Sequence, residues 1–158
     1  MKGMIATILL LFIQSEVSLK EVRDAYFGSA KGIVDAKKFE KLLDSVREDA
    51  APVLLCYKGA AEMLKAKNAV SPISKYSFFK RGKALIEAGI SRDTSCLESH
   101  FIRFSIQRNL PGFLGYDRNI MQDSMMVVKG LSELNDKDLK FKITGYFSRL
   151  RAGNNKSN

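Results

Sequence analysis

The chain has 158 residues, about the length of one domain, and 46% of them are hydrophobic, which is enough to build a core. It holds 26 Lys and Arg against 17 Asp and Glu, and the formal net charge of +9 first suggests a nucleic-acid partner. Two Cys exclude a disulfide-dense scaffold, and a single His leaves little material for a metal site or a His-based catalytic network. We therefore expect no cofactor, no metal and no enzymatic activity.

The first fifteen residues have the layout of a secretory signal peptide. Lys2 precedes an apolar run from Met4 to Ile13, and a polar exit follows at Gln14. The run is too short to span a bilayer, which needs roughly 20 apolar residues. We expect a signal peptide over 1–15, cleavage near Ser15 and export, to the periplasm or otherwise. The alternative is a buried N-terminal segment of a cytosolic protein.

Helical signals follow one another along residues 16–152, which we interpret as a single helical domain before a flexible tail over 153–158. Ser18 and Glu21 form a capping box for a first helix, which the stretch 28–32 (GSAKG) ends. A second helix begins near Asp35 and has one buried stripe, made of Phe39, Leu42, Leu43 and Val46.

Two prolines mark the starts of the longest predicted helices. Pro52 lies in the first turn of a helix that runs to about Lys67, and Pro72, with Ser71 as N-cap, opens one that runs to about Ile90. Residues 93–95 (DTS) open a fifth helix, which Pro111 ends.

Two further helices are expected after the loop 111–115. Asp117 caps the first of them, and Asn135 or Asp136 caps the second. Their expected core stripes are Met121, Met125, Val128 and Leu131, then Leu139, Ile143, Phe147 and Leu150. Because strand signals are nearly absent, the sequence predicts an all-α fold of about seven helices.

The third and fourth predicted helices resemble a tetratricopeptide repeat. Tyr57, Ala60, Ala61 and Leu64 follow the pattern of the first helix of that repeat, and Leu85, Ala88 and Asp93 follow the end of its second helix. The resemblance implies antiparallel helical hairpins in a tetratricopeptide-like right-handed stack, in which small residues let paired helices approach closely.

A wider resemblance covers most of the chain. Residues 52–60 (PVLLCYKGA), 79–83 (FKRGK), 98–107 (ESHFIRFSIQ) and 109–116 (NLPGFLGY) are similar to segments of a family of small exported bacterial helical proteins of uncharacterised function. This resemblance implies a signal peptide and a helical fold, and it implies no activity.

Arg103, Gln107 and Tyr116 are the candidate binding residues. Arg103 and Gln107 lie four apart on one helix face, ahead of a Gly/Pro loop that includes Tyr116. Together they could line a groove that accepts a carboxylate or backbone carbonyls, since Arg suits bidentate acceptors. In the alternative, Phe113 and Tyr116 pack the loop onto the core and Arg103 caps carbonyl groups.

The signal for catalysis or metal binding is weaker at Cys56, Cys96 and His100. Cys96 and His100 share a helix face, but a zinc site needs a fuller ligand set and a Cys nucleophile needs a positioned third group. We favour Cys56 and Cys96 as buried thiols over a disulfide, and His100 at the rim of a half-buried helix start. An enzyme would need a perturbed acid or base, for which Glu98 or Asp117 is the candidate.

Basic residues gather in two places, Lys75 to Lys83 and the acid-free stretch 139–158, which holds five of them. Removal of the leader, with Lys2, lowers the net charge from +9 to +8. Export disfavours nucleic acid as the partner and favours an acidic protein or an anionic membrane surface. The leading hypothesis is a non-catalytic exported scaffold that binds another protein or peptide. The alternative is a basic binder of an anionic membrane surface or ligand.

Overall fold

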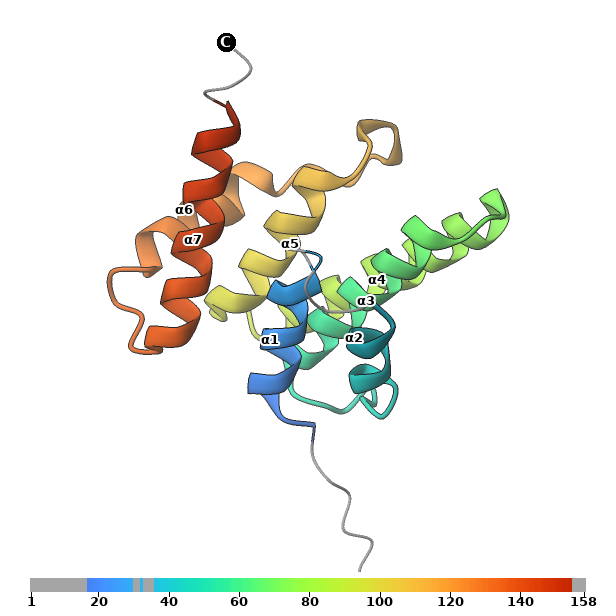
Figure 1. Ribbon diagram of the computed structural model, residues 1–158, viewed down its shortest axis with the longest axis horizontal. Helices are drawn as coiled ribbons and strands as arrows, with labels where there is room; N and C mark the ends of the chain where they lie inside the picture. Colours follow the sequence, from blue (N-terminus) through green and yellow to red (C-terminus); the bar gives the residue numbers. More distant parts are fainter. Residues whose placement is uncertain (1–16, 30–31, 33–35, 155–158) are drawn as a thin grey trace, which may run out of the picture.

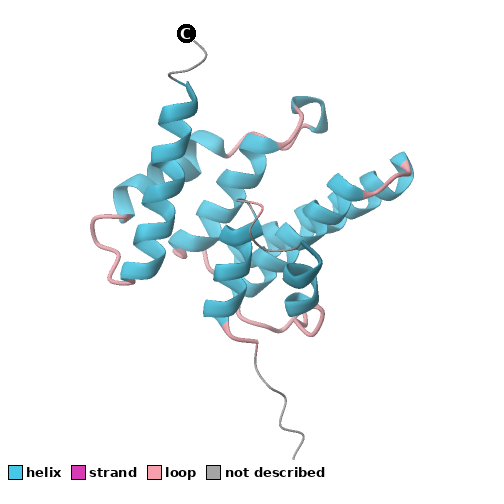
Figure 2. Ribbon diagram, viewed as in Figure 1, coloured by secondary structure: helices cyan, strands magenta, loops and turns pink. Residues whose placement is uncertain are grey.

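The computed structural model describes residues 17–29, 32 and 36–154, and it places seven α-helices and one short 3-10 helix in that part of the chain. No strand occurs among these residues, which confirms the all-α fold of about seven helices (Figure 2). The proposed leader over 1–15 lies outside the described residues. In chain order the helices are α1 Leu19–Ser29, α2 Ala36–Leu43, α3 Pro52–Asn68, α4 Pro72–Arg92, α5 Leu97–Asn109, η1 Gly112–Leu114, α6 Ile120–Gly130 and α7 Lys137–Asn154.

Several helix starts follow the local chemistry of the sequence, whereas α6 begins at Ile120, after Asn119 and not after the expected cap Asp117. Pro52 and Pro72 are the first residues of α3 and α4, as expected. The Asp136 carboxylate accepts a bond from the backbone N–H of Leu139 at 3.0 Å and so caps α7. The fifth helix begins at Leu97, later than expected, because the Asp93 side chain instead holds the Ser95 amide in a turn.

Two antiparallel hairpins organise the fold, α3 with α4 and α5 with α6 (Figure 1). Within the α3–α4 hairpin the helices approach most closely at glycines. A Cβ added to Gly82 would lie 2.8 Å from the Gly59 carbonyl oxygen, and one added to Gly89 would lie 2.5 Å from the Pro52 carbonyl oxygen. Ala60 and Ala61, the small residues of the repeat-like pattern, are also buried, but the closest approach is at the glycines. A regular right-handed tetratricopeptide-like stack stays a prediction.

Two apolar clusters form the core. The larger lies among α1 to α5 and includes Phe39, Tyr57 and Ile86, while the smaller joins Phe27 and Phe101 to the inner faces of α6 and α7. Leu139 and Ile143 are buried as expected. Phe147 and Leu150, from the same stripe, are half-buried.

Helix α6 is rotated relative to the expectation. Met121, Met125 and Val128 were expected in the core, but all three are exposed, Met121 at 76%. The buried residues of α6 are Asp123 and Val127, on the opposite face. The Asp123 carboxylate is bound by side chains of α5, and Val127 is part of the smaller apolar cluster, so the inner face of α6 combines ionic pairing with apolar burial.

None of the described helices is long and apolar enough to cross a membrane. Helix α7 continues to Asn154, two residues into the expected tail over 153–158, and residues 155–158 lie outside the described part.

Candidate functional site

The three candidate residues gather beneath the α5–α6 connection. Arg103 and Gln107 lie one turn apart on the inner face of α5, and Tyr116 lies in the connection that follows η1. All three are buried, Gln107 with 2% of its surface exposed. The sequence prediction placed these three side chains along an open groove, whereas the structure buries all of them.

Arg103 is bound by carboxylates on two helices. Its Nε and Nη2 donate to Asp123 at 2.7 and 2.8 Å, and its Nη1 donates to Glu87 of α4 at 2.8 Å. Burial lowers the pKa of Arg103, but the bonds to Asp123 outweigh burial and leave the pKa raised. Because every guanidinium nitrogen is engaged, Arg103 neither caps carbonyls nor offers a free fork to a ligand.

His100 completes this buried cluster from one turn earlier in α5. Its Nδ1 lies 2.7 Å from an Asp123 oxygen, and its Nε2 lies 3.0 Å from the Thr94 carbonyl oxygen. The bond to Asp123 raises the pKa of His100. The expected position at a rim is wrong, because only 6% of His100 is exposed.

Tyr116 attaches the connection to α4. Its hydroxyl donates to the Glu87 oxygen that Arg103 does not bind, at 2.6 Å, and its ring makes a T-shaped contact with that of Phe79, with the centroids 6.2 Å apart. Burial, followed by the bond to Glu87, raises the pKa of Tyr116 well above its ordinary range. Phe113 was expected to pack beside it but is 88% exposed, because η1 carries it outward.

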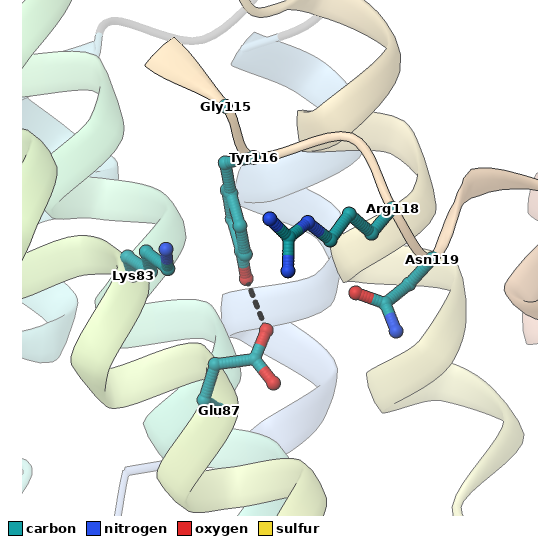
Figure 3. A pocket seen from close by; sticks show the side chains of 6 residues that line it. All are labelled: Lys83, Glu87, Gly115, Tyr116, Arg118 and Asn119. Atoms are coloured by element: carbon teal, nitrogen blue, oxygen red, sulfur yellow. Dashed lines mark hydrogen bonds between the residues drawn. The ribbon is translucent and has the colours of Figure 1, made fainter.

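A pocket of about 360 Å³ opens directly over this cluster. Figure 3 shows the Tyr116 ring between the side chains of Lys83 and Arg118, with its hydroxyl on Glu87. The lining residues are Lys83, Glu87, Gly115, Tyr116, Arg118 and Asn119.

Only one of the three candidate residues lines this pocket. Arg103 and Gln107 are not part of the lining, but each binds a lining residue. Gln107 donates to Asn119 at 3.3 Å, and Arg103 holds Glu87. The expected groove is corrected accordingly, since Arg103 and Gln107 position the wall and do not form it.

The lining of the pocket is cationic. The Lys83 ammonium lies 5.0 Å from the Tyr116 ring centroid, and Arg118 forms no ion pair with any residue in the described part of the chain. The carboxylates of Glu87 and Asp123 both pair with the Arg103 guanidinium, so these three side chains together carry a net charge of −1. Lys83 and Arg118 outweigh it, so the site is positive by one charge with His100 neutral and by two with His100 protonated.

Of the four charged residues that define this site, the sequence analysis included Lys83 in the basic cluster Lys75 to Lys83 and missed Glu87, Arg118 and Asp123. Two of them left a signal. Glu87 is the only acid in α4, and Asp123 is the only charged residue in the first eight positions of α6. An acidic residue that stands alone in a basic or apolar helix indicates an ion pair with a residue of another element.

A second buried ionic cluster joins α1 to α5. Arg23 donates to both oxygens of Glu98 at 2.8 and 2.9 Å and to Asp136 at 2.9 Å, and the Tyr57 hydroxyl donates to Glu98 at 2.5 Å. Hydrogen bonding to Glu98 raises the pKa of Arg23. Glu98, one candidate catalytic acid, therefore anchors two helices, whereas Asp117, the other, is exposed.

Both cysteines are free thiols. Cys56 is buried and Cys96 is half-buried at the start of α5. Burial raises the pKa of Cys56 to about 11, which keeps the thiol protonated at neutral pH. Within residues 17–29, 32 and 36–154, no three His, Cys, Asp or Glu side chains are grouped so that they could hold a metal ion.

Comparison of the chain with protein-family models, with curated proteins and with solved structures found no match. The resemblances to a tetratricopeptide repeat and to a family of exported helical proteins therefore stay predictions.

Proposed function

We propose that this protein is a non-catalytic helical scaffold, exported to the periplasm, that binds another protein or peptide through an acidic group. The pocket between α4 and the α5–α6 connection supports the proposal. It presents two cationic side chains, Lys83 and Arg118, whose charges no carboxylate in the described residues pairs directly. Its one acid, Glu87, already accepts bonds from Tyr116 and Arg103.

The chemistry of the pocket suits a carboxylate from a partner. Asn119 and Arg118 offer N–H donors on the side of the Tyr116 ring away from the Lys83 ammonium, and these are the groups that bind carboxylate oxygens (Figure 3). The buried ionic cluster behind Tyr116 fixes the wall before any partner arrives, so little ordering is needed on binding.

A second surface supports a protein as the partner in preference to a small anion. Met121, Met125 and Val128 form an exposed apolar stripe along α6, and a shallow hollow lies between Met125, Val128 and Lys129. Met side chains adapt to varied partners, and exposed apolar patches mark interaction surfaces.

A peptide titration tests the proposal. A fluorescein-labelled hexaglutamate peptide should bind the wild-type protein, and hexaglutamine should not. The double variant Lys83→Gln/Arg118→Gln should weaken hexaglutamate binding at least tenfold, since each exposed ionic contact contributes up to about 1 kcal/mol and partly buried ones more.

The matched control is Arg149→Gln/Arg151→Gln, which removes the same charge from α7. Its affinity for hexaglutamate should stay close to that of the wild type. Equal weakening by both double variants would show that only net charge matters and would remove the pocket from the proposal.

A further inference from the structure

The turn between α3 and α4 exposes apolar side chains at one end of the molecule. Val70 is 96% exposed and Ile73 is 83% exposed, and Tyr76 follows one turn into α4, also exposed. Figure 1 shows this end of the hairpin projecting away from the other helices. Val70 and Ile73 belong to neither apolar cluster, whereas the Tyr76 ring centroid lies 6.3 Å from that of Phe79, a core residue.

The same end of the hairpin is strongly basic. Residues 63–86 contain six Lys and Arg and no Asp or Glu. Lys65 and Arg81 pair with Glu62, further down the hairpin. The remaining cations nearest the turn, Lys67, Lys75 and Lys80, are exposed, and none of them forms an ion pair with a described residue.

From this juxtaposition we propose that the α3–α4 turn docks on an anionic lipid bilayer, with Val70 and Ile73 inserted at the headgroup boundary. Lys67, Lys75 and Lys80 then lie at the level of the lipid phosphates, and Tyr76 occupies the interfacial layer that Tyr favours. The inference goes beyond the protein-binding function and uses a different part of the molecule.

The shape and charge of the turn favour a bilayer over a protein. Two or three apolar side chains on a projecting end give weak insertion, and a neighbouring cluster of cations supplies the second contribution that stable attachment needs. A protein would instead require a concave acidic partner shaped to this end.

The basic C-terminal region does not share this surface. Helix α7 lies at the opposite end of the molecule from the α3–α4 turn (Figure 1), and Lys142 pairs with Asp24 and Asp138. A flat bilayer that meets the turn therefore leaves α7 in solution, so the two basic regions do not act as one face.

Tryptophan fluorescence tests the docking, because the chain contains no Trp. Ile73→Trp places a probe at the turn, and Phe141→Trp places a matched control at an exposed apolar position of α7. With vesicles of phosphatidylglycerol and phosphatidylcholine, the emission of Ile73→Trp should shift to the blue and that of Phe141→Trp should not. Phosphatidylcholine alone should give little shift, and added salt should weaken binding.

Charge variants in the Ile73→Trp background test the basic contribution. The triple variant Lys67→Gln/Lys75→Gln/Lys80→Gln should weaken vesicle binding on the order of a hundredfold, because each cation near the surface contributes about fivefold to the affinity. Lys140→Gln/Arg149→Gln/Arg151→Gln removes the same charge from α7 and should leave the affinity within about twofold, since those cations are out of reach of the bilayer.

Three results would overturn the inference. They are no blue shift from Ile73→Trp, an equal shift from Phe141→Trp, and equal weakening by the two triple variants. A blue shift of Ile73→Trp with hexaglutamate but not with vesicles would assign the turn to a protein partner instead. Loss of peptide binding in Lys83→Gln/Arg118→Gln bears on the pocket alone, so the two proposals fail separately.

Discussion

Replacement of Gly89 by Ala probes the contact that holds the longest hairpin together. A Cβ at this position would lie 2.5 Å from the Pro52 carbonyl oxygen and 2.6 Å from the Cys56 Sγ. Ordinary contact begins at 3.4 Å, so α3 and α4 would have to separate by up to about 0.9 Å at this crossing. The obstacle includes backbone, which cannot move aside as a flexible side chain can.

Two opposing effects set the size of the change. Ala in place of Gly inside a helix stabilises by about 1 kcal/mol, because Gly loses more backbone entropy on folding. Overpacking a tight contact costs about 1–3 kcal/mol, and the backbone clash places Gly89→Ala at the upper end. We expect a net loss of about 2 kcal/mol in the free energy of unfolding, or a Tm lower by about 4–8 °C.

Gly145→Ala is the matched control. Gly145 is also inside a helix, α7, but the nearest atom to an added Cβ is Nη1 of Arg149, at 3.5 Å. This variant should therefore gain most of the helix propensity, about 0.5–1 kcal/mol. Urea unfolding followed by circular dichroism should separate the two variants by about 3 kcal/mol. If Gly89→Ala is as stable as Gly145→Ala, the close approach of α3 and α4 at Gly89 is wrong.

Two further predictions concern buried titratable groups. Because Asp123 raises the pKa of His100, the His100 contribution to stability is complete below its ordinary pKa of about 6.5 and is lost as pH rises through the higher folded value. The urea midpoint should fall over that window in the wild type and not in His100→Gln, and an identical slope in both would contradict the assignment. Burial raises the pKa of Cys56 to about 11, so in Cys96→Ser the thiol of Cys56 should react with a thiol reagent only after unfolding. Reaction at equal rates in buffer and in urea would show that Cys56 is accessible in the folded protein.

The candidate site shows where sequence reasoning succeeds. The i, i+4 spacing of Arg103 and Gln107 places them on one face of α5, and the Pro/Gly segment after them forms the connection that returns Tyr116 to their side. What this reasoning does not supply is the partner of each polar group. Glu87 lies 16 residues before Arg103, and Asp123 lies 20 residues after it. No local rule links such positions, so the burial of Arg103 and the cationic lining of the pocket emerge only when α4, α5 and α6 pack.

The sequence by itself determined the all-α fold, the approximate bounds of seven helices and the inner faces of α2 and α7. Prolines at helix starts, a capping Asp and apolar spacing act within a few residues, and they need no tertiary contact.

The tertiary structure decided the rotation of α6, since the face that carries Asp123 and Val127 found partners on α5 and in the smaller apolar cluster, and the more apolar stripe on the other face did not. It also divided the basic charge of the chain. In the described part of the chain the basic charge includes separate groups at the α3–α4 turn, on α7 and in a small pocket, because pairs such as Lys142 with Asp24 join residues far apart in the sequence.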